Sequence, residues 1–245
     1  MNLRLIILLF LFFPLSSYSS IFKNNYEIHL EEATTSEVNQ AKFYSITSEI
    51  YKLFSQTNIL VNYEWDKPYF TAYAHEESAH NFSINFWGGL ARIPDMLEET
   101  WAFIVCHELG HILGGEPHLS IETLRWASSE GQSDYFAAQI CLPRYFKSKI
   151  KSNIEQQDYL PFELGLCLKR YEKTEDQSIC LQILRAQRGF VAINRYMQND
   201  EDYEFNREVE FNNNSSMPTL QCRMNTITDG ATCIHKVCER NKCWY

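Results

Sequence analysis

The sequence lacks the excess of positive charge that nucleic-acid binding requires. Its 245 residues include 22 lysines and arginines against 31 aspartates and glutamates, which gives a net charge of −9. Affinity for nucleic acids relies on basic side chains that neutralise phosphates. The composition therefore argues against DNA or RNA as a partner.

The sequence also lacks an apolar run long enough to cross a membrane, since a transmembrane helix needs about 20 consecutive apolar residues. The run "LIILLFLFFPL" is shorter; it follows Arg4 and precedes the small residues "SSYSS". This order predicts a signal peptide over residues 1–20, cleaved near Ser19 or Ser20. We expect an exported chain, periplasmic or extracellular, with no stable membrane insertion after cleavage; an uncleaved anchor is the alternative. No cysteine stands at the cleavage region, which argues against a lipoprotein anchor.

The sequence has no C-x-x-C pair, the usual ligand arrangement of a cysteine zinc site. It does have eight cysteines, and four of them lie between Cys222 and Cys243. An even number of cysteines in an exported chain predicts disulfides, because the compartment is oxidising. A second zinc site in this tail is the less favoured alternative. We expect one folded domain over residues 21–205, with a connector and a cysteine-rich tail over residues 206–245 packed on it.

Residue periodicity predicts an α+β fold. Helical spacing occurs from Ser36, a possible N-cap, to Phe54. Strand patterns occur at residues 58–65, 69–74 and 80–87, with a turn at 75–79 between the last two and a continuation of the sheet at 90–93. The best-marked helix has a capping box at Asp95 and Glu98 and ends at Gly114-Gly115. A second helix is expected from Ser129 to Leu142, ended by Pro143, and the chain to about Tyr203 is mainly helical.

The last two turns of the best-marked helix contain the motif H-E-x-x-H, formed by His107, Glu108 and His111. Imidazoles four residues apart lie one above the other on a helix, so both can bind one ion. Glu108 projects about 100° round from His107, where it can take a proton from a zinc-bound water. The motif predicts one Zn²⁺ per chain and a catalytic Glu108. Two ordinary helix histidines beside a glutamate are the alternative.

The third metal ligand has two candidates. In H-E-x-x-H-x-x-G-x-x-H the third histidine position falls on Pro117 here, and His118 lies one residue too late. The stretch "SSEGQSD" offers Glu130 and Asp134, four residues apart on a second helix. A carboxylate is an acceptable zinc ligand, and a second one can accept the free N–H of a ligating histidine. We therefore predict Glu130 as the third ligand and Asp134 as the partner of a ligating histidine.

His107-Glu108-Leu109-Gly110-His111 followed by Glu130-Gly-Gln-Ser-Asp134 resembles the gluzincin zinc metallopeptidases. The resemblance implies a zincin-like fold: a small mixed or antiparallel sheet packed on two metal-binding helices, with further helices beside it. It also implies a protein or peptide substrate, held in extended form by an edge strand beside the cleft. Further stretches, including "WAS.EGQSDYFA" and the "QCR" of the tail, are similar to a group of exported bacterial proteins.

Other residues have expected roles that the sequence leaves open. A donor to the developing oxyanion is needed besides the metal, and the candidates are His118, Tyr135, Arg144 and His235. Cys106 and Cys141 lie on the two ligand helices, so they either form a disulfide that joins these helices or are buried free thiols.

The expected function is an exported zinc metallopeptidase that hydrolyses peptide bonds. Two alternatives remain: a non-catalytic structural or inhibitory protein with the same zinc site, and a cell-envelope binding module that uses the tail. Neither the cleavage specificity nor the oligomeric state is determined by the sequence.

Overall fold

The computed structural model describes residues 18–20, 35–149, 156–196, 218–234, 236 and 238. Their strands are β1 (Tyr18–Ser20), β2 (Ile59–Glu64), β3 (Ala72–Ser78) and β4 (Asn81–Trp87). Their α-helices are α1 (Gln40–Lys52), α2 (Gly88–Ala91), α3 (Glu98–Leu113), α4 (Glu130–Phe136), α5 (Leu142–Lys147), α6 (Pro161–Arg170), α7 (Thr174–Tyr196) and α8 (Leu220–Ala231). Short helical turns of other types span Glu122–Leu124, Ala137–Cys141 and Gln156–Asp158. The predicted α+β class is confirmed, with a small mixed sheet.

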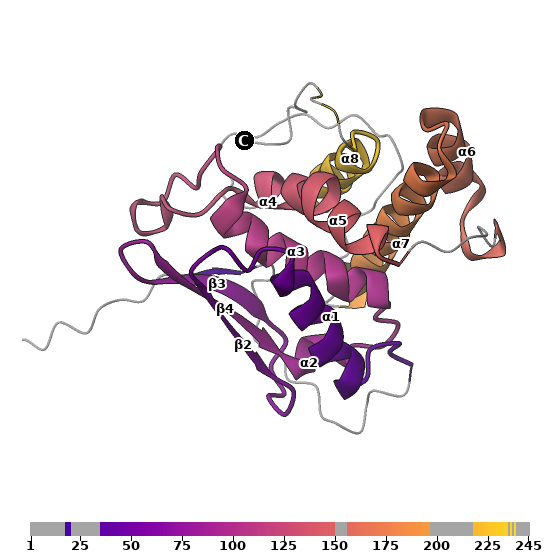
Figure 1. Ribbon diagram of the computed structural model, residues 1–245. Coiled ribbons are helices and arrows are strands. Elements are labelled where there is room, and N and C mark those ends of the chain that lie inside the picture. Colours follow the sequence, from indigo (N-terminus) through magenta and orange to yellow (C-terminus); the bar gives the residue numbers. More distant parts are fainter. Residues whose placement is uncertain are drawn as a thin grey trace, which may run out of the picture.

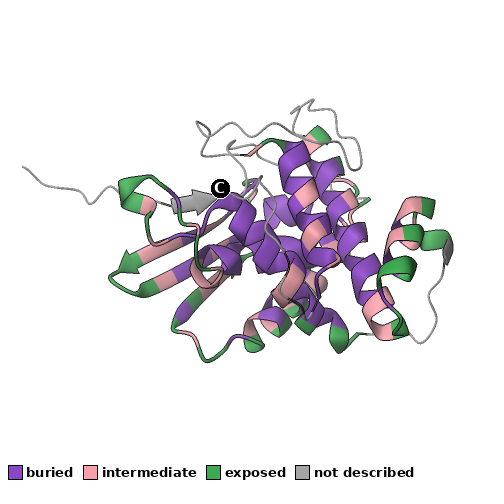
Figure 2. Ribbon diagram, turned by 90° about the horizontal axis from the view of Figure 1, so that it is seen from above, coloured by how far each residue is buried: buried purple, intermediate pink, exposed green. Residues whose placement is uncertain are grey.

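Helix α3 is the centre of the molecule. The sheet lies on one side of it, and α4, α5, α7 and α8 lie on the other (Figure 1). Every residue of α3 from Thr100 to His111 is buried, so this helix has no solvent-facing side over these residues. Buried residues concentrate in the central helices, whereas exposed residues lie at the periphery (Figure 2). None of the described helices is both long enough and apolar enough to cross a membrane.

The sheet has the strand order β1-β3-β4-β2. Strand β3 is antiparallel to both neighbours, and β2 is parallel to β4. Ala72 and Ala74 of β3 pair with Phe86 and Ile84 of β4, and all four side chains are buried. Since alanine is small, α3 packs close to β3, and the larger side chains of β4 fill the space beside it.

The structure corrects five local predictions. Helix α1 is capped by Asn39, which accepts from the Lys42 N–H at 3.0 Å, rather than by Ser36. Helix α3 begins at Glu98 and has no capping box, because its N-cap is Leu97, which has no side-chain acceptor, rather than Asp95. Strand β3 extends to Ser78, so residues 75–78 belong to the sheet rather than to a turn.

The fourth correction concerns residues 90–93, which do not continue the sheet. Residues Gly88–Ala91 form α2 instead. A Cβ on Gly88 would lie 2.0 Å from the Trp65 carbonyl oxygen, and one on Gly89 would lie 2.1 Å from that of Pro68. The paired glycines therefore let the chain turn directly against the segment that follows β2.

Pro143 does not end the second ligand helix. A π-helical segment, Ala137–Cys141, continues α4 into α5, whose first turn contains Pro143. A proline within a helix removes one N–H···O=C bond and crowds the preceding turn, and the π-helical turn that interrupts the regular bonding lies directly before Pro143. The predicted helix therefore extends past its expected end, to Lys147.

Disulfides join the elements that the site depends on. Cys106 of α3 is bonded to Cys141, which confirms that alternative over free thiols. Cys167 and Cys180 join α6 to α7, Cys233 is bonded to Cys238, and Cys222 is disulfide-bonded as well. A cysteine zinc site in the tail is disfavoured, because Cys222, Cys233 and Cys238 are engaged in disulfides. The tail also contains α8, a helix that the sequence analysis did not predict.

Replacing both Cys106 and Cys141 by serine is expected to lower the free energy of unfolding by about 3–4 kcal/mol, because their bond closes a loop of moderate length in the unfolded chain. The bond spans 35 residues, whereas Cys167–Cys180 spans 13. Denaturant unfolding of the two double-serine variants checks this. The variant without the Cys106–Cys141 bond should lose more stability than the variant without Cys167–Cys180. A Cys106/Cys141 variant as stable as the wild type would contradict this prediction.

Candidate metal site

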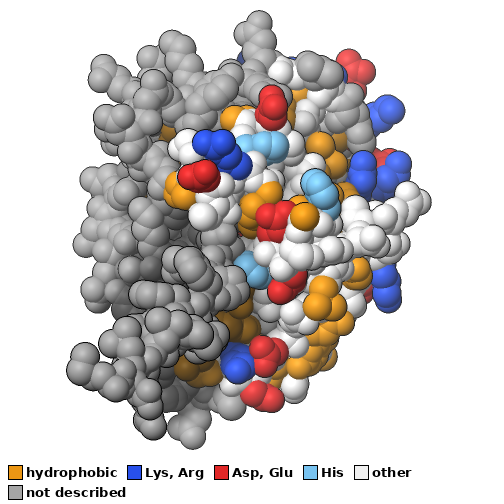
Figure 3. Space-filling view, turned by 90° about the vertical axis from the view of Figure 1, so that its left-hand side faces the viewer, with side chains coloured by type: hydrophobic (Ala, Val, Ile, Leu, Met, Phe, Trp, Pro, Cys, Tyr) orange, Lys and Arg blue, Asp and Glu red, His pale blue; other side chains and the backbone are white. Residues whose placement is uncertain are grey.

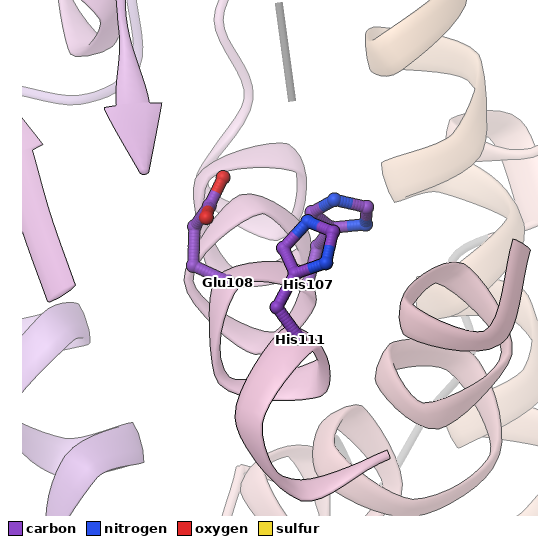
Figure 4. Close-up of side chains that lie close together, drawn as sticks. All are labelled: His107, Glu108 and His111. Carbon is purple, nitrogen blue, oxygen red and sulfur yellow. The ribbon is translucent and has the colours of Figure 1, made fainter. Parts of the chain in front are cut away.

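The H-E-x-x-H motif lies at the end of α3, where His107, Glu108 and His111 are each completely buried. Ligand atoms of these three residues lie within 4.8 Å of one another, so the group could hold a metal ion. Figure 4 shows the two imidazoles on the side of α3 that faces the other helices and Glu108 on the side nearer the strands. Glu108 therefore projects toward the strands, while its carboxylate stays within reach of the same ion as the imidazoles.

Helix α4 brings two acidic side chains to the imidazoles. Glu130 is its first residue, after the cap Ser129, and Asp134 lies one turn later. The Glu130 carboxylate is 3.2 Å from His107 Nε2 through Oε2 and 3.6 Å from His111 Nε2 through Oε1. Asp134 contacts the other nitrogen of His107, Nδ1, so the two acids contact different atoms of the same ring.

Close packing of α3 on α4 depends on Gly110, between the two halves of the motif. A Cβ on Gly110 would lie 2.8 Å from both the Cα and the carbonyl oxygen of Ser133. Because these are backbone atoms of α4, a larger residue would push the helices apart. Glycine at this position therefore sets the distance between the imidazoles and Glu130.

The hydrogen bonds of the two histidines fix their tautomers. His107 Nδ1–H donates to Asp134 Oδ1 at 2.8 Å, and His111 Nδ1–H donates to the Ser128 carbonyl oxygen at 2.9 Å. A carboxylate and a carbonyl only accept, so each Nδ1 has a proton. In the neutral rings each Nε2 then has a lone pair, and both lone pairs face Glu130.

This arrangement fits a bound cation. His107 Nε2 and Glu130 Oε2 are buried, lie 3.2 Å apart and have no hydrogen-bond partner. Two electron-pair donors held this close in a buried site repel each other unless a proton or a metal ion lies between them. Two imidazole nitrogens and a carboxylate are a common protein ligand set for zinc.

Arg223 completes the site and was not among the predicted site residues. It lies on α8, is buried, and donates to both Asp134 oxygens at 2.8 Å. Its Nη2 is also 3.6 Å from Glu130 Oε2. The available signal was an arginine in the "QCR" segment, but 89 residues separate it from Asp134. Arg223 therefore connects the C-terminal helix to both acids of the site.

Charges in the site shift several pKa values in the metal-free protein. Burial lowers the pKa of an imidazole, but Asp134 and Glu130 raise that of His107 to about 9. Burial lowers the pKa of His111 to about 4. Burial opposes ionisation of Glu130 and Asp134, yet the imidazoles and Arg223 lower the pKa of both, that of Glu130 to about 2. Without metal, one proton on His107 therefore takes the place of a cation.

This raised pKa predicts how the metal-free protein responds to pH. A group whose pKa is higher in the folded state stabilises the fold fully below its unfolded pKa and loses that effect as the pH rises through the folded value. For His107 the loss lies between about 6.5 and 9. We expect the Tm measured in EDTA to fall over this range more than the Tm with zinc, which would take the place of the titrating proton on His107 Nε2. Equal falls with and without zinc would contradict this.

The remaining predicted donors are not gathered in this group. His118 is exposed in the loop after α3, where its backbone pairs with Ser128. Figure 3 shows histidine side chains reaching the surface on this end of the molecule. Tyr135 is buried on α4, and Arg144 is exposed and lies over the Phe54 ring at 5.2 Å. His235 lies outside the described residues, so the donor stays a prediction.

Comparisons with known proteins identify no family for this chain: no family model, no curated protein and no solved structure matches it. The resemblance to the gluzincins therefore depends on the motif residues alone.

Proposed function

We propose that the protein is an exported zinc-dependent peptidase whose ligands are His107, His111 and Glu130. The observation that carries this proposal is a pair of buried atoms without a hydrogen-bond partner, His107 Nε2 and Glu130 Oε2, which lie 3.2 Å apart. Both Nδ1 atoms are used in hydrogen bonds, which leaves the Nε2 atoms for the ion. Three protein ligands leave a fourth position open, as is typical of catalytic zinc sites.

The chain's own residues divide the work of hydrolysis. Bound Zn²⁺ would polarise the scissile carbonyl and make water more acidic. Asp134 and the Ser128 carbonyl hold the imidazoles in the ligating tautomer. Glu108 accepts a proton from the attacking water and passes it to the leaving amine, because its carboxylate lies within 4.8 Å of the imidazole ligand atoms, on the side of α3 nearer the strands (Figure 4).

Complete burial of Glu108 favours a second candidate function, a non-catalytic zinc site in an exported binding protein. Structural zinc sites are closed to solvent, and they contribute directly to folding. In that case the metal would stabilise the fold without turnover.

Metal analysis combined with a peptide-library digest tests the proposal. The peptidase should contain about one zinc per chain, lose cleavage on treatment with a chelator, and recover it when zinc is added back. Zinc that binds tightly and raises the Tm, with no cleavage of any library peptide, would favour the non-catalytic alternative. A protein that binds no divalent ion would contradict both.

Replacing Asp134 by asparagine is expected to weaken zinc binding by about 10- to 100-fold, because the carboxylate that orients His107 is lost. Competition with a chromophoric chelator measures the affinity. The matched control is Asp158→Asn, at an exposed position in the turn Gln156–Asp158. Affinity that is unchanged in the Asp134 variant would show that the hydrogen bond to His107 Nδ1 does not position the ring.

A further inference from the structure

The candidate site is closed to solvent, whereas a peptidase has to admit a peptide to its metal. The side chains of His107, Glu108 and His111 are completely buried, and Glu130 is 3% exposed. A catalytic zinc keeps one coordination position open for water and substrate, so it needs a path to the surface. Under the proposed function, part of the chain therefore covers the site and moves aside when a peptide enters.

The loop that joins α3 to α4, residues 114–129, is attached to the site at its base. The Ser128 carbonyl oxygen accepts from His111 Nδ1 at 2.9 Å, and the Ser128 N–H donates to the His111 carbonyl oxygen at 2.8 Å. Ser128 Oγ also donates to the Gly115 carbonyl oxygen at 2.7 Å. Because the base holds a metal ligand, only the outer part of the loop, residues 119–127, can move without disturbing the imidazole.

This outer part reaches the sheet through a pair of rings. The Trp126 ring centroid lies 5.3 Å from that of Phe82 in β4. Alternate residues of a strand share a face, so Phe82 is on the same face as the buried Ile84, the face on which α3 packs. Glu108 projects from α3 toward the strands (Figure 4). The ring contact therefore joins the loop to the sheet on the side of α3 that presents the proposed base.

The ring contact is only moderately favourable. Both Phe82 and Trp126 are partly buried, so their rings gain less than complete removal from water. Trp126 Nε1 is buried and has no hydrogen-bond partner among the described residues. A buried indole N–H normally finds an acceptor, and leaving it without one costs its desolvation energy. Water or a peptide carbonyl oxygen can accept this bond once the rings separate, which favours opening.

We propose that residues 119–127 form a cover over the metal site, held on the sheet by the contact between Phe82 and Trp126 and displaced when a peptide enters. The entry of a peptide rests on the proposed function; closure of the site by the loop does not. The cover thus controls access to the metal while the base of the loop keeps His111 in its ligating tautomer.

Three variants and a control test this. Phe82→Ala and Trp126→Ala each remove the ring contact from one side, whereas Trp126→Phe keeps a ring and removes the indole N–H. The control is Tyr63→Ala, because Tyr63 of β2 makes a comparable ring contact with Tyr44 of α1, at 5.4 Å. Two rates are measured on each variant once its Tm shows that it is folded. They are hydrogen exchange of residues 119–127 in the metal-free protein, and removal of zinc from the loaded protein by phenanthroline.

Both alanine variants should exchange residues 119–127 and release zinc at least about tenfold faster than the wild type, because loss of the aromatic contact shifts the loop toward its open position. Trp126→Phe should be no faster than the wild type, since a ring remains and the unsatisfied donor is gone. Tyr63→Ala should leave both rates unchanged. The equilibrium affinity for zinc should not change, because a cover that opens more often speeds entry and exit alike.

Unchanged zinc release in both alanine variants would overturn the proposal, even with faster loop exchange. Faster release with an equal loss of affinity would also overturn it, because the rings would then support the ligands rather than cover them. The proposed function fails separately. The expected rates in a protein that cleaves nothing would keep the cover and remove the peptidase. If no zinc binds, the proposed function is refuted, and loop exchange alone decides whether the rings hold the loop on the sheet.

Discussion

Glu108→Gln is expected to abolish most peptide hydrolysis while leaving zinc bound. Glutamine has the shape of glutamate but cannot accept a proton from water, and loss of a general base costs about 10²- to 10⁴-fold in rate. The proposed zinc ligands are His107, His111 and Glu130, and the Glu108 carboxylate projects on the strand side of α3 (Figure 4), so its loss should leave these ligands in place. Activity on a cleaved library peptide and zinc content, measured on the same sample, check both parts.

A matched control comes from another buried glutamate. Glu163 is completely buried, caps α6 by accepting from the Leu160 N–H at 2.8 Å, and pairs with Arg188 at 3.3 Å. Glu163→Gln should reduce stability and leave the rate per zinc-loaded molecule unchanged. Full activity in the Glu108 variant would remove this residue from the mechanism. Loss of zinc in that variant would instead make Glu108 a ligand.

The parts of the site that the sequence predicts are those with short-range spacing. His107 and His111, and then Glu130 and Asp134, lie four residues apart on helices, so helical geometry alone places each pair on one face. Glu130 follows α3 closely enough that a single loop returns it to the imidazoles. Local periodicity likewise located β2, β4 and the main helices.

Long-range contacts decide what the sequence analysis missed. Arg223 reaches Asp134 across 89 residues, and no local pattern distinguishes it from a surface arginine. Residues 90–93 have an apolar strand composition, but the backbone contacts of Gly88 and Gly89 turn the chain into α2. Strand β1 has three residues in the described part of the chain, fewer than the runs of four to eight from which a strand pattern can be recognised.

Arg223→Met is expected to cause the largest loss of stability, about 3–5 kcal/mol in the metal-free protein, because it leaves buried carboxylates without their partner. Both oxygens of Asp134 bond to Arg223 at 2.8 Å, and Glu130 lies within 3.6 Å of it. Denaturant unfolding in EDTA measures the loss. Zinc should restore part of the stability, because it binds only the folded state and supplies the missing positive charge.

Arg185 provides the control. It pairs with Glu37 at 2.9 Å and with Glu99, but its side chain is 22% exposed, so Arg185→Met should cost about 1 kcal/mol or less. Arg223→Lys should lie between the two methionine variants, since an ammonium group cannot reproduce two parallel bonds to one carboxylate. If Arg223→Met and Arg185→Met lost equal stability, the contact between α8 and Asp134 would be no stronger than a surface ion pair. The C-terminal helix would then have no energetic role in forming the site.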